Sequence, residues 1–253
     1  MIRAAVLDLD GTLIGRDERL SARVAAAVRQ LSDSIPVSIA TGREAAHAVR
    51  YARQLGLTAP QICDGGAAIL DPDSGKSLWT APLAPDLAKQ IIYSLHANGT
   101  AFIATHPEGS VKTISGICGR SLIRVSALDM DEVGADRVVA QFLPEPQLQV
   151  VKVFLPYNDL WAVDFTRRGI DKAAGARRLA GMIGVDVRDM VAAGDSYNDL
   201  PLLQVCGLSI AMGDAPQELK AVADYLAPPA DEDGLAVAIE EFVLPRLGPS
   251  SQV

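Results

Sequence analysis

Cysteine is scarce in this sequence of 253 residues: only Cys63, Cys118 and Cys206 occur, and they lie far apart. An odd number of distant cysteines is unlike a disulfide framework or a C-x-x-C zinc site. Long apolar runs are absent as well, because no run approaches the roughly 18 residues of a membrane span. The first residues reach Asp8 before a signal-peptide core can form. We therefore expect a cytoplasmic protein without a membrane partner.

Basic charge and histidine are also in short supply. The chain has 23 Lys and Arg against 31 Asp and Glu, a net charge of -8, which is the wrong sign for nucleic-acid binding by counterion release. Its 3 histidines are scattered, and the sequence contains no H-E-x-x-H, G-x-G-x-x-G, P-loop or G-x-S-x-G motif. These absences argue against nucleic-acid, zinc, dinucleotide and serine-nucleophile functions. A metal site or a nucleophile would have to come from carboxylates.

Short apolar runs alternate with amphipathic segments at both ends of the chain. The expected strands cover residues 2–9, 35–40, 60–63, 190–193 and 208–211. The expected helices cover 22–31, a segment that ends near 55, and then 171–183, 198–205, 217–223 and 235–247. Such alternation predicts an α/β fold with a doubly wound parallel sheet and right-handed crossovers.

The middle of the chain has a different pattern. Helices are expected at 85–97 and 131–142, and strands near 100–105, 111–114, 148–155 and 161–165. Runs of strands between helices indicate a smaller α+β module inserted into the sheet domain. We expect a core of residues 1–80 and 167–253, an inserted module of residues 81–166, and an unstructured tail at 248–253.

The first candidate for chemistry is Asp8-Leu9-Asp10-Gly11-Thr12, at the end of the first expected strand. Asp8 and Asp10 are two residues apart on an extended chain, so their side chains point the same way, at the strand end where open parallel sheets bind ligands. The competing interpretation is a simple Asp-Gly turn. A calcium loop is excluded because its twelfth position holds Arg19 and not Glu.

Three further candidates lie at strand ends or helix starts. The segment from Thr41 through Gly42 to Arg43 is compatible with either an anion-binding site or a plain helix N-cap. Lys172, near a helix start, is by itself typical of a solvated surface lysine. Asp195 and Asp199, four residues apart across a turn, are able to converge on one hard cation.

Taken in this order, these motifs resemble the haloacid dehalogenase superfamily of phosphohydrolases over nearly the whole chain. The long insertion after Thr41 resembles the cap of the Cof-type branch. Two later stretches resemble that branch's A-M-G-N and N-E-D-G-V, namely Ala211-Met212-Gly213-Asp214 and Asp231-Glu232-Asp233-Gly234-Leu235. Two departures stand out: Asp214 replaces the usual Asn, and Asp64-Gly65-Gly66-Ala67 stands where the family tends to have N-G-A.

The resemblance implies a phosphatase that works through an aspartyl phosphate. Asp8 would be the nucleophile, and Asp10 would protonate the leaving group and then activate water. Mg²⁺ would bind Asp8, the main-chain carbonyl of Asp10, Asp195 and Asp199. The residues that would hold the phosphate are Thr41, Gly42, Arg43, Lys172 and Asn198.

The expected substrate is a small phosphorylated metabolite, either a sugar phosphate or a phosphoglycolate-like acid. A phosphomutase of the same superfamily is the nearest alternative, since it shares the aspartyl phosphate. A non-catalytic phosphate-binding protein is a more distant one, because binding alone would not require Asp10. The sequence does not predict the oligomeric state.

Overall fold

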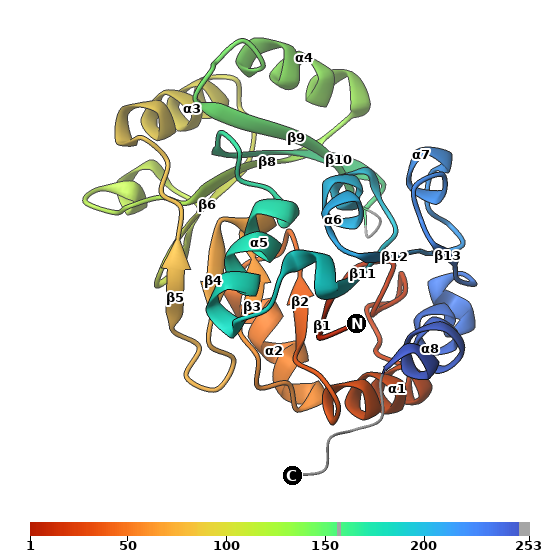
Figure 1. The fold of residues 1–253 in the computed structure, drawn as a ribbon. Helices are drawn as coiled ribbons and strands as arrows, with labels where there is room; N and C mark the ends of the chain where they lie inside the picture. Colours follow the sequence, from red (N-terminus) through yellow and green to blue (C-terminus); the bar gives the residue numbers. More distant parts are fainter. Residues whose placement is uncertain (156–157, 248–253) are drawn as a thin grey trace.

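The computed structural model describes residues 1–155 and 158–247, and it contains two separate β-sheets (Figure 1). The larger sheet has eight strands in the order β13-β12-β11-β1-β2-β3-β4-β5. They are β1 (Ala4–Asp8), β2 (Val37–Ala40), β3 (Gln61–Cys63), β4 (Ala68–Leu70), β5 (Ser77–Thr80), β11 (Met190–Gly194), β12 (Leu208–Ala211) and β13 (Tyr225–Leu226). Every predicted strand of the core is present in this sheet.

Six of the eight strands are joined by parallel pairing, and β1 lies between β2 and β11. The strands β4 and β5 are antiparallel and extend the sheet beyond β3. These two strands were not predicted: each is only three or four residues long, too short for a clear period. The predicted doubly wound parallel sheet is confirmed, with an antiparallel edge added.

Helices cover both faces of this sheet because the side chains of β1 alternate between two cores. Ala5 and Leu7 pack with one helix layer, and Ala4 and Val6 with the other. The first layer contains α1 (Ala22–Ser32), α2 (Ala45–Leu55) and α8 (Gly234–Ala238). The second layer contains α5 (Lys172–Ile183), α6 (Leu200–Val205) and α7 (Gln217–Lys220).

Most helix bounds lie within two residues of the prediction. Ser21 caps α1 by accepting a hydrogen bond from the Val24 amide, and Asp171 caps α5 in the same way. The last expected helix, residues 235–247, consists instead of α8, a π-helical turn at Ile239–Val243 and a 3-10 turn at Leu244–Arg246. The expected helix 198–205 begins as a 3-10 turn, and α6 starts at Leu200.

The smaller sheet is antiparallel, with the strand order β7-β6-β8-β10-β9. Its strands are β6 (Phe102–His106), β7 (Gly109–Val111), β8 (Arg124–Met130), β9 (Leu148–Leu155) and β10 (Leu160–Arg167). Two helices, α3 (Pro85–Ala97) and α4 (Glu132–Phe142), pack on the face turned away from the larger sheet (Figure 1). This is the α+β arrangement that the sequence predicted for the middle of the chain.

Two details of the smaller sheet differ from the expectation. The strand expected at 111–114 ends at Val111, and a 3-10 turn follows at Ile114–Ile117. The central strand β8 was not predicted, because the polar residues Arg124 and Ser126 alternate with its apolar ones yet are also buried. The tail expected at 248–253 lies outside the described residues. Within the described part of the chain, no helix is long and apolar enough to cross a membrane.

Candidate active site

Three carboxylates meet at the carboxyl ends of neighbouring strands. Asp8 is the last residue of β1, and Asp195 directly follows β11, which pairs with β1 in parallel register. Asp199 lies one short turn further on, in the 3-10 segment Tyr197–Asp199. One oxygen from each of the three side chains lies within 4.8 Å of the others. The sheet therefore gathers three oxygen ligands at one point, as open parallel sheets gather ligands in general.

Lys172, the first residue of α5, lies among these carboxylates. Its ammonium group is 2.5 Å from Oδ1 of Asp8 and 2.6 Å from Oδ1 of Asp199, and it donates a third hydrogen bond of 3.3 Å to Asn198. The lysine is only 3% exposed. The interpretation of Lys172 as a solvated surface residue is therefore excluded.

The electrostatics of the cluster follow from burial and crowding. Burial raises the pKa of Asp8 well above its usual value; the charge of Asp199 raises it further, and Lys172 opposes both. Burial and Asp199 also raise the pKa of Asp195, to about 7. Burial would lower the pKa of Lys172, but the charges of Asp199 and Asp8 outweigh it and raise that pKa. The lysine therefore stays charged. A proton or another cation is needed to compensate the remaining negative charge of the carboxylates.

The second oxygen of Asp199 is held by its own loop. Oδ2 accepts hydrogen bonds from the amides of Asp195 and Ser196, at 3.2 and 3.1 Å, and from the Ser196 hydroxyl. Ser196 also donates to Oδ1 of Asn198 at 2.6 Å. Asn198 therefore links Lys172 to the turn, and its expected contact with phosphate stays a prediction.

Two glycines allow the segments to approach this closely. Gly11 has a φ of 72°, and a Cβ at this position would lie 2.0 Å from Oδ2 of Asp195. Gly66 has a φ of 100°, and its Cβ would lie 2.0 Å from the Asp171 carbonyl at the start of α5. Any larger residue at Gly11 would displace Asp195, and at Gly66 it would displace the helix that carries Lys172.

Asp10 does not join the three carboxylates through its side chain. Both of its oxygens accept hydrogen bonds from Nε of Arg43, at 3.1 and 2.9 Å, and Oδ1 accepts another of 2.6 Å from the guanidinium. The same guanidinium donates to Glu18 at 2.6 Å. In this structure Arg43 holds Asp10, and its expected contact with phosphate stays a prediction.

The loop after β2 carries Thr41 and Gly42. Thr41 is fully buried, and its hydroxyl oxygen accepts a hydrogen bond from the Arg43 amide at 3.0 Å, which leaves the hydroxyl proton free to donate elsewhere. Among the described residues, no atom lies within 4 Å of the position that a Cβ on Gly42 would take. The Gly42 carbonyl accepts a hydrogen bond from Arg124 in the smaller sheet. This contact was not predicted from the sequence.

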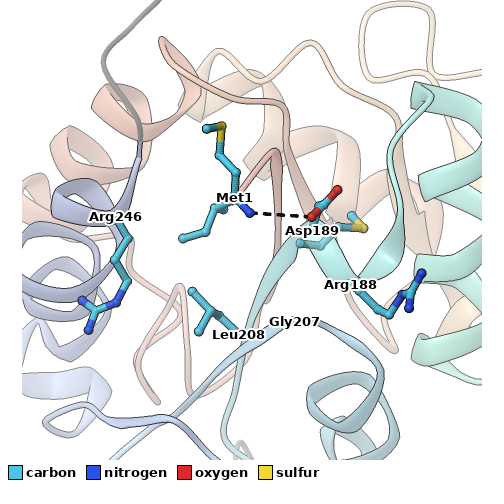
Figure 2. A pocket seen from close by; sticks show the side chains of 8 residues that line it. Met1, Arg188, Asp189, Gly207, Leu208 and Arg246 are labelled. Atoms are coloured by element: carbon cyan, nitrogen blue, oxygen red, sulfur yellow. Dashed lines mark ion pairs between the residues drawn. The ribbon is translucent and has the colours of Figure 1, made fainter.

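A pocket of about 210 Å³ lies at the amino-terminal ends of β11 and β12, opposite the strand ends that carry the carboxylates (Figure 2). Its wall includes Asp189, just before β11, whose carboxylate lies 3.8 Å from the amino group of Met1. The lining residues are Met1, Ile2, Arg188, Asp189, Met190, Gly207, Leu208 and Arg246. None of the candidate catalytic residues contributes to this pocket.

Comparison with known proteins agrees with the fold and the motifs. A family model of haloacid dehalogenase-like hydrolases matches residues 5–115 and 119–239. The phosphoglycolate phosphatase of Methanothermobacter thermautotrophicus is 26% identical over 244 residues, covering 96% of this chain and 99% of that protein. The chain therefore belongs to the haloacid dehalogenase-like hydrolases, and the predicted enzyme class, a phosphatase of this family, is confirmed.

Solved structures show the same fold at lower identity. A haloacid dehalogenase-like hydrolase from B. subtilis aligns with a TM-score of 0.85 at 18% identity, covering 95% of this chain and all of that chain (100%). A sugar phosphatase described as subclass IIB of the superfamily aligns with a TM-score of 0.80 at 20% identity, covering 95% and 98%. Both structural alignments cover the two sheets.

Proposed function

We propose that this protein is a Mg²⁺-dependent phosphomonoester hydrolase that uses Asp8 as its nucleophile. One observation carries the proposal: a buried lysine, Lys172, bridges Asp8 and Asp199 while a third carboxylate, Asp195, lies within reach of both. Such a concentration of buried charge is costly to the fold, so it is typical of a site that works on a charged ligand.

The donor set fits a hard divalent cation. The three clustered ligands, Asp8, Asp195 and Asp199, all offer carboxylate oxygens, which suit Mg²⁺ better than zinc or copper. Asp10 would contribute only its main-chain carbonyl, because Arg43 occupies its carboxylate. A bound Mg²⁺ would supply positive charge to the phosphoryl oxygens and so favour attack on phosphorus.

The chain's own groups account for the two chemical steps. A carboxylate oxygen of Asp8 forms a bond to phosphorus, and the bond from phosphorus to the leaving oxygen breaks with its electron pair on that oxygen. For the first step, one oxygen of Asp10 has to leave Arg43 and carry a proton, which Asp10 gives to the leaving oxygen. It then takes a proton from a water molecule that attacks phosphorus, which releases phosphate and regenerates Asp8.

Thr41 and Lys172 are proposed to hold the phosphoryl oxygens. The Thr41 hydroxyl proton is free, and Lys172 lies directly against the nucleophile. Because Lys172 already donates to Asp8, Asp199 and Asn198, it has to exchange one of these contacts for the phosphate. Its charge offsets the negative charge that gathers when phosphate enters.

The two sheets are proposed to have different roles in the reaction. We assign the chemistry to a core of residues 1–80 and 167–253, and substrate choice and water exclusion to a cap of residues 81–166. A sugar phosphate or a phosphoglycolate-like acid is proposed as substrate. The support is the activity named for two similar proteins, one a phosphoglycolate phosphatase and the other a sugar phosphatase.

Phosphate release from a panel of phosphorylated metabolites tests this proposal. We expect Mg²⁺-dependent release of inorganic phosphate that stops in EDTA and in the Asp8→Asn variant. Asp73→Asn, in an exposed loop, is the control and should behave as the parent. Transfer of phosphate within a sugar, without net release, would instead identify a mutase. Binding of phosphate esters without either reaction would indicate a non-catalytic protein.

A further inference from the structure

Arg124 is a buried arginine in the smaller sheet that contacts three separate segments. Its side chain is 8% exposed and comes from the start of β8. One guanidinium nitrogen donates to the Gly42 carbonyl and lies 3.5 Å from Asp164 in β10. Another lies 3.1 Å from Oδ1 of Asp64. A planar guanidinium is well suited to bind several acceptors at fixed angles.

Two of these acceptors belong to the larger sheet. Gly42 follows β2, and Asp64 follows β3, whereas Asp164 lies beside β8 in the smaller sheet. Asp164 is itself fixed by a 2.5 Å hydrogen bond from Ser126. Arg124 therefore joins the smaller sheet to the ends of two neighbouring strands of the larger one.

The two loops that Arg124 contacts are also bonded to each other. The Asp64 amide donates to the Arg43 carbonyl at 2.9 Å, and the Gly65 amide donates to the Thr41 carbonyl at 3.0 Å. Arg124 thus binds the loop of residues 41–43 directly, through Gly42, and indirectly, through Asp64. A displacement of the guanidinium would move Thr41 and Arg43 together.

Apolar residues keep water away from this contact. Cys63, Ala81, Ile123 and Ile170 belong to one buried cluster, and Ile123 directly precedes Arg124. Ala81 and Ile170 lie where the chain passes between the two sheets. The ion pair is therefore at the junction of the sheets. A small movement of the chain at this junction would change the orientation of the smaller sheet relative to the larger one.

We propose that Arg124 is a positioning residue that fixes the loop of residues 41–43 against the smaller sheet and, through Arg43, aligns Asp10. This inference rests on the proposed function of Asp10. It also accounts for the departure of the Asp64-Gly65-Gly66-Ala67 stretch from the N-G-A pattern. The carboxylate of Asp64 gives the buried guanidinium a second counter-ion beside Asp164, which an asparagine would not supply.

Arg124→Lys tests the proposal with little change in charge. A lysine ammonium is a single point of charge and is unable to hold Gly42 and Asp64 in the same geometry. We expect kcat to fall about 10- to 100-fold, as for a catalytic group displaced by a fraction of an ångström to one ångström. The Mg²⁺ requirement should stay as in the parent. Amide hydrogen exchange at Asp64 and Gly65 should become faster.

Lys152→Met is the matched control. Lys152 is also a cation of the smaller sheet with two carboxylate partners, Glu132 and Asp136, at 3.3 and 2.5 Å. These partners lie on α4, on the side away from the larger sheet. Its loss should leave kcat and the exchange at Asp64 and Gly65 unchanged.

A second variant, Arg124→Gln with Asp64→Asn, removes both charges of the closest pair and keeps the proposal testable if Arg124→Lys does not fold. It should show the same fall in kcat and the same faster exchange. Parent-like kcat and exchange in a folded variant would overturn the proposal, as would an equal effect of Lys152→Met. If the parent hydrolyses no phosphate ester, the proposed function fails, and the exchange measurement alone then decides whether Arg124 holds the loop.

Discussion

The ammonium group of Lys172 lies 2.5 Å from a carboxylate oxygen of Asp8, although 164 positions separate the two residues in the chain. The start of α5 and the end of β1 bring them together, and Asp199 holds the lysine from its other side at 2.6 Å. Because all three groups are buried, the lysine compensates charge that water does not reach.

Replacing Lys172 by methionine should reduce both stability and activity. Without the ammonium, two buried carboxylates lose their counter-ion, and we expect the free energy of unfolding of the metal-free protein to fall by about 3 kcal/mol. We expect kcat to fall at least about 10²-fold, since a charged donor at the phosphoryl group is lost. Thermal unfolding and phosphate release measure the two effects. Lys89→Met, at an exposed position, should change neither.

Metal binding should depend on pH around neutrality. In the metal-free protein, the pKa of Asp195 is about 7, so this carboxyl is mostly protonated below pH 7 and mostly ionised above it. Mg²⁺ has to displace that proton, and its apparent affinity should therefore fall as the pH drops from 8 to 6. Calorimetry in two buffers of different ionisation enthalpy should detect more proton release at pH 6 than at pH 8, with the raised pKa of Asp8 adding to that of Asp195.

The matched control for this effect is Asp186→Asn. The hydrogen bonds from Arg188 lower the pKa of Asp186 to about 2, so this exposed carboxylate is ionised throughout the range. The variant should bind Mg²⁺ as the parent does at each pH. An affinity that stays constant between pH 6 and 8 in the parent would contradict the assignment of Asp195 to the metal site.

Arg43→Lys should impair the handling of the leaving group. The guanidinium holds both oxygens of Asp10, and a lysine retains the charge without that geometry. We expect kcat for an alkyl phosphate to fall about 10-fold or more, because its alkoxide leaving group needs the proton from Asp10. The phosphorylation step with p-nitrophenyl phosphate should change less, as seen in the burst of nitrophenol. Arg23→Lys, at an exposed pair with Glu240, is the control.

Gly11→Ala should weaken the metal site and the fold together. The substitution forces a side chain into the left-handed region and places a Cβ 2.0 Å from Oδ2 of Asp195. We expect a loss of about 1–3 kcal/mol in the free energy of unfolding and a weaker response to Mg²⁺. Gly181→Ala, inside α5 with nothing within 4 Å, should instead raise stability by about 0.5–1 kcal/mol. A Gly11→Ala protein with parent-like metal affinity would contradict this geometry.

Much of the fold could be predicted from periodicity and capping. The runs of β1 and β11 are apolar because both faces of the sheet are covered, and Ser21 and Asp131 mark helix starts by their side-chain oxygens. The strand β8 was not predicted because two of its buried residues, Arg124 and Ser126, are polar. A single sequence does not show that such residues have partners in distant segments.

The candidate site was predictable to a similar extent. Asp8, Asp195 and Asp199 follow strands that lie side by side, so the topology alone brings them together, and the motifs named Lys172. The partner of Arg43 was not predictable, because its guanidinium reaches Asp10 and Glu18 across a loop whose path is set by tertiary contacts. The catalytic and binding roles of these residues stay predictions until they are tested.

The proposed mechanism requires Asp8 to carry the phosphoryl group during turnover. The most direct measurement is rapid acid quenching of the parent with a phosphate-labelled substrate and Mg²⁺, followed by mass spectrometry of the peptides. We expect a labelled acyl phosphate on Asp8 that appears within one turnover and is absent in Asp8→Asn. A label on another residue, or undiminished turnover by Asp8→Asn, would contradict it.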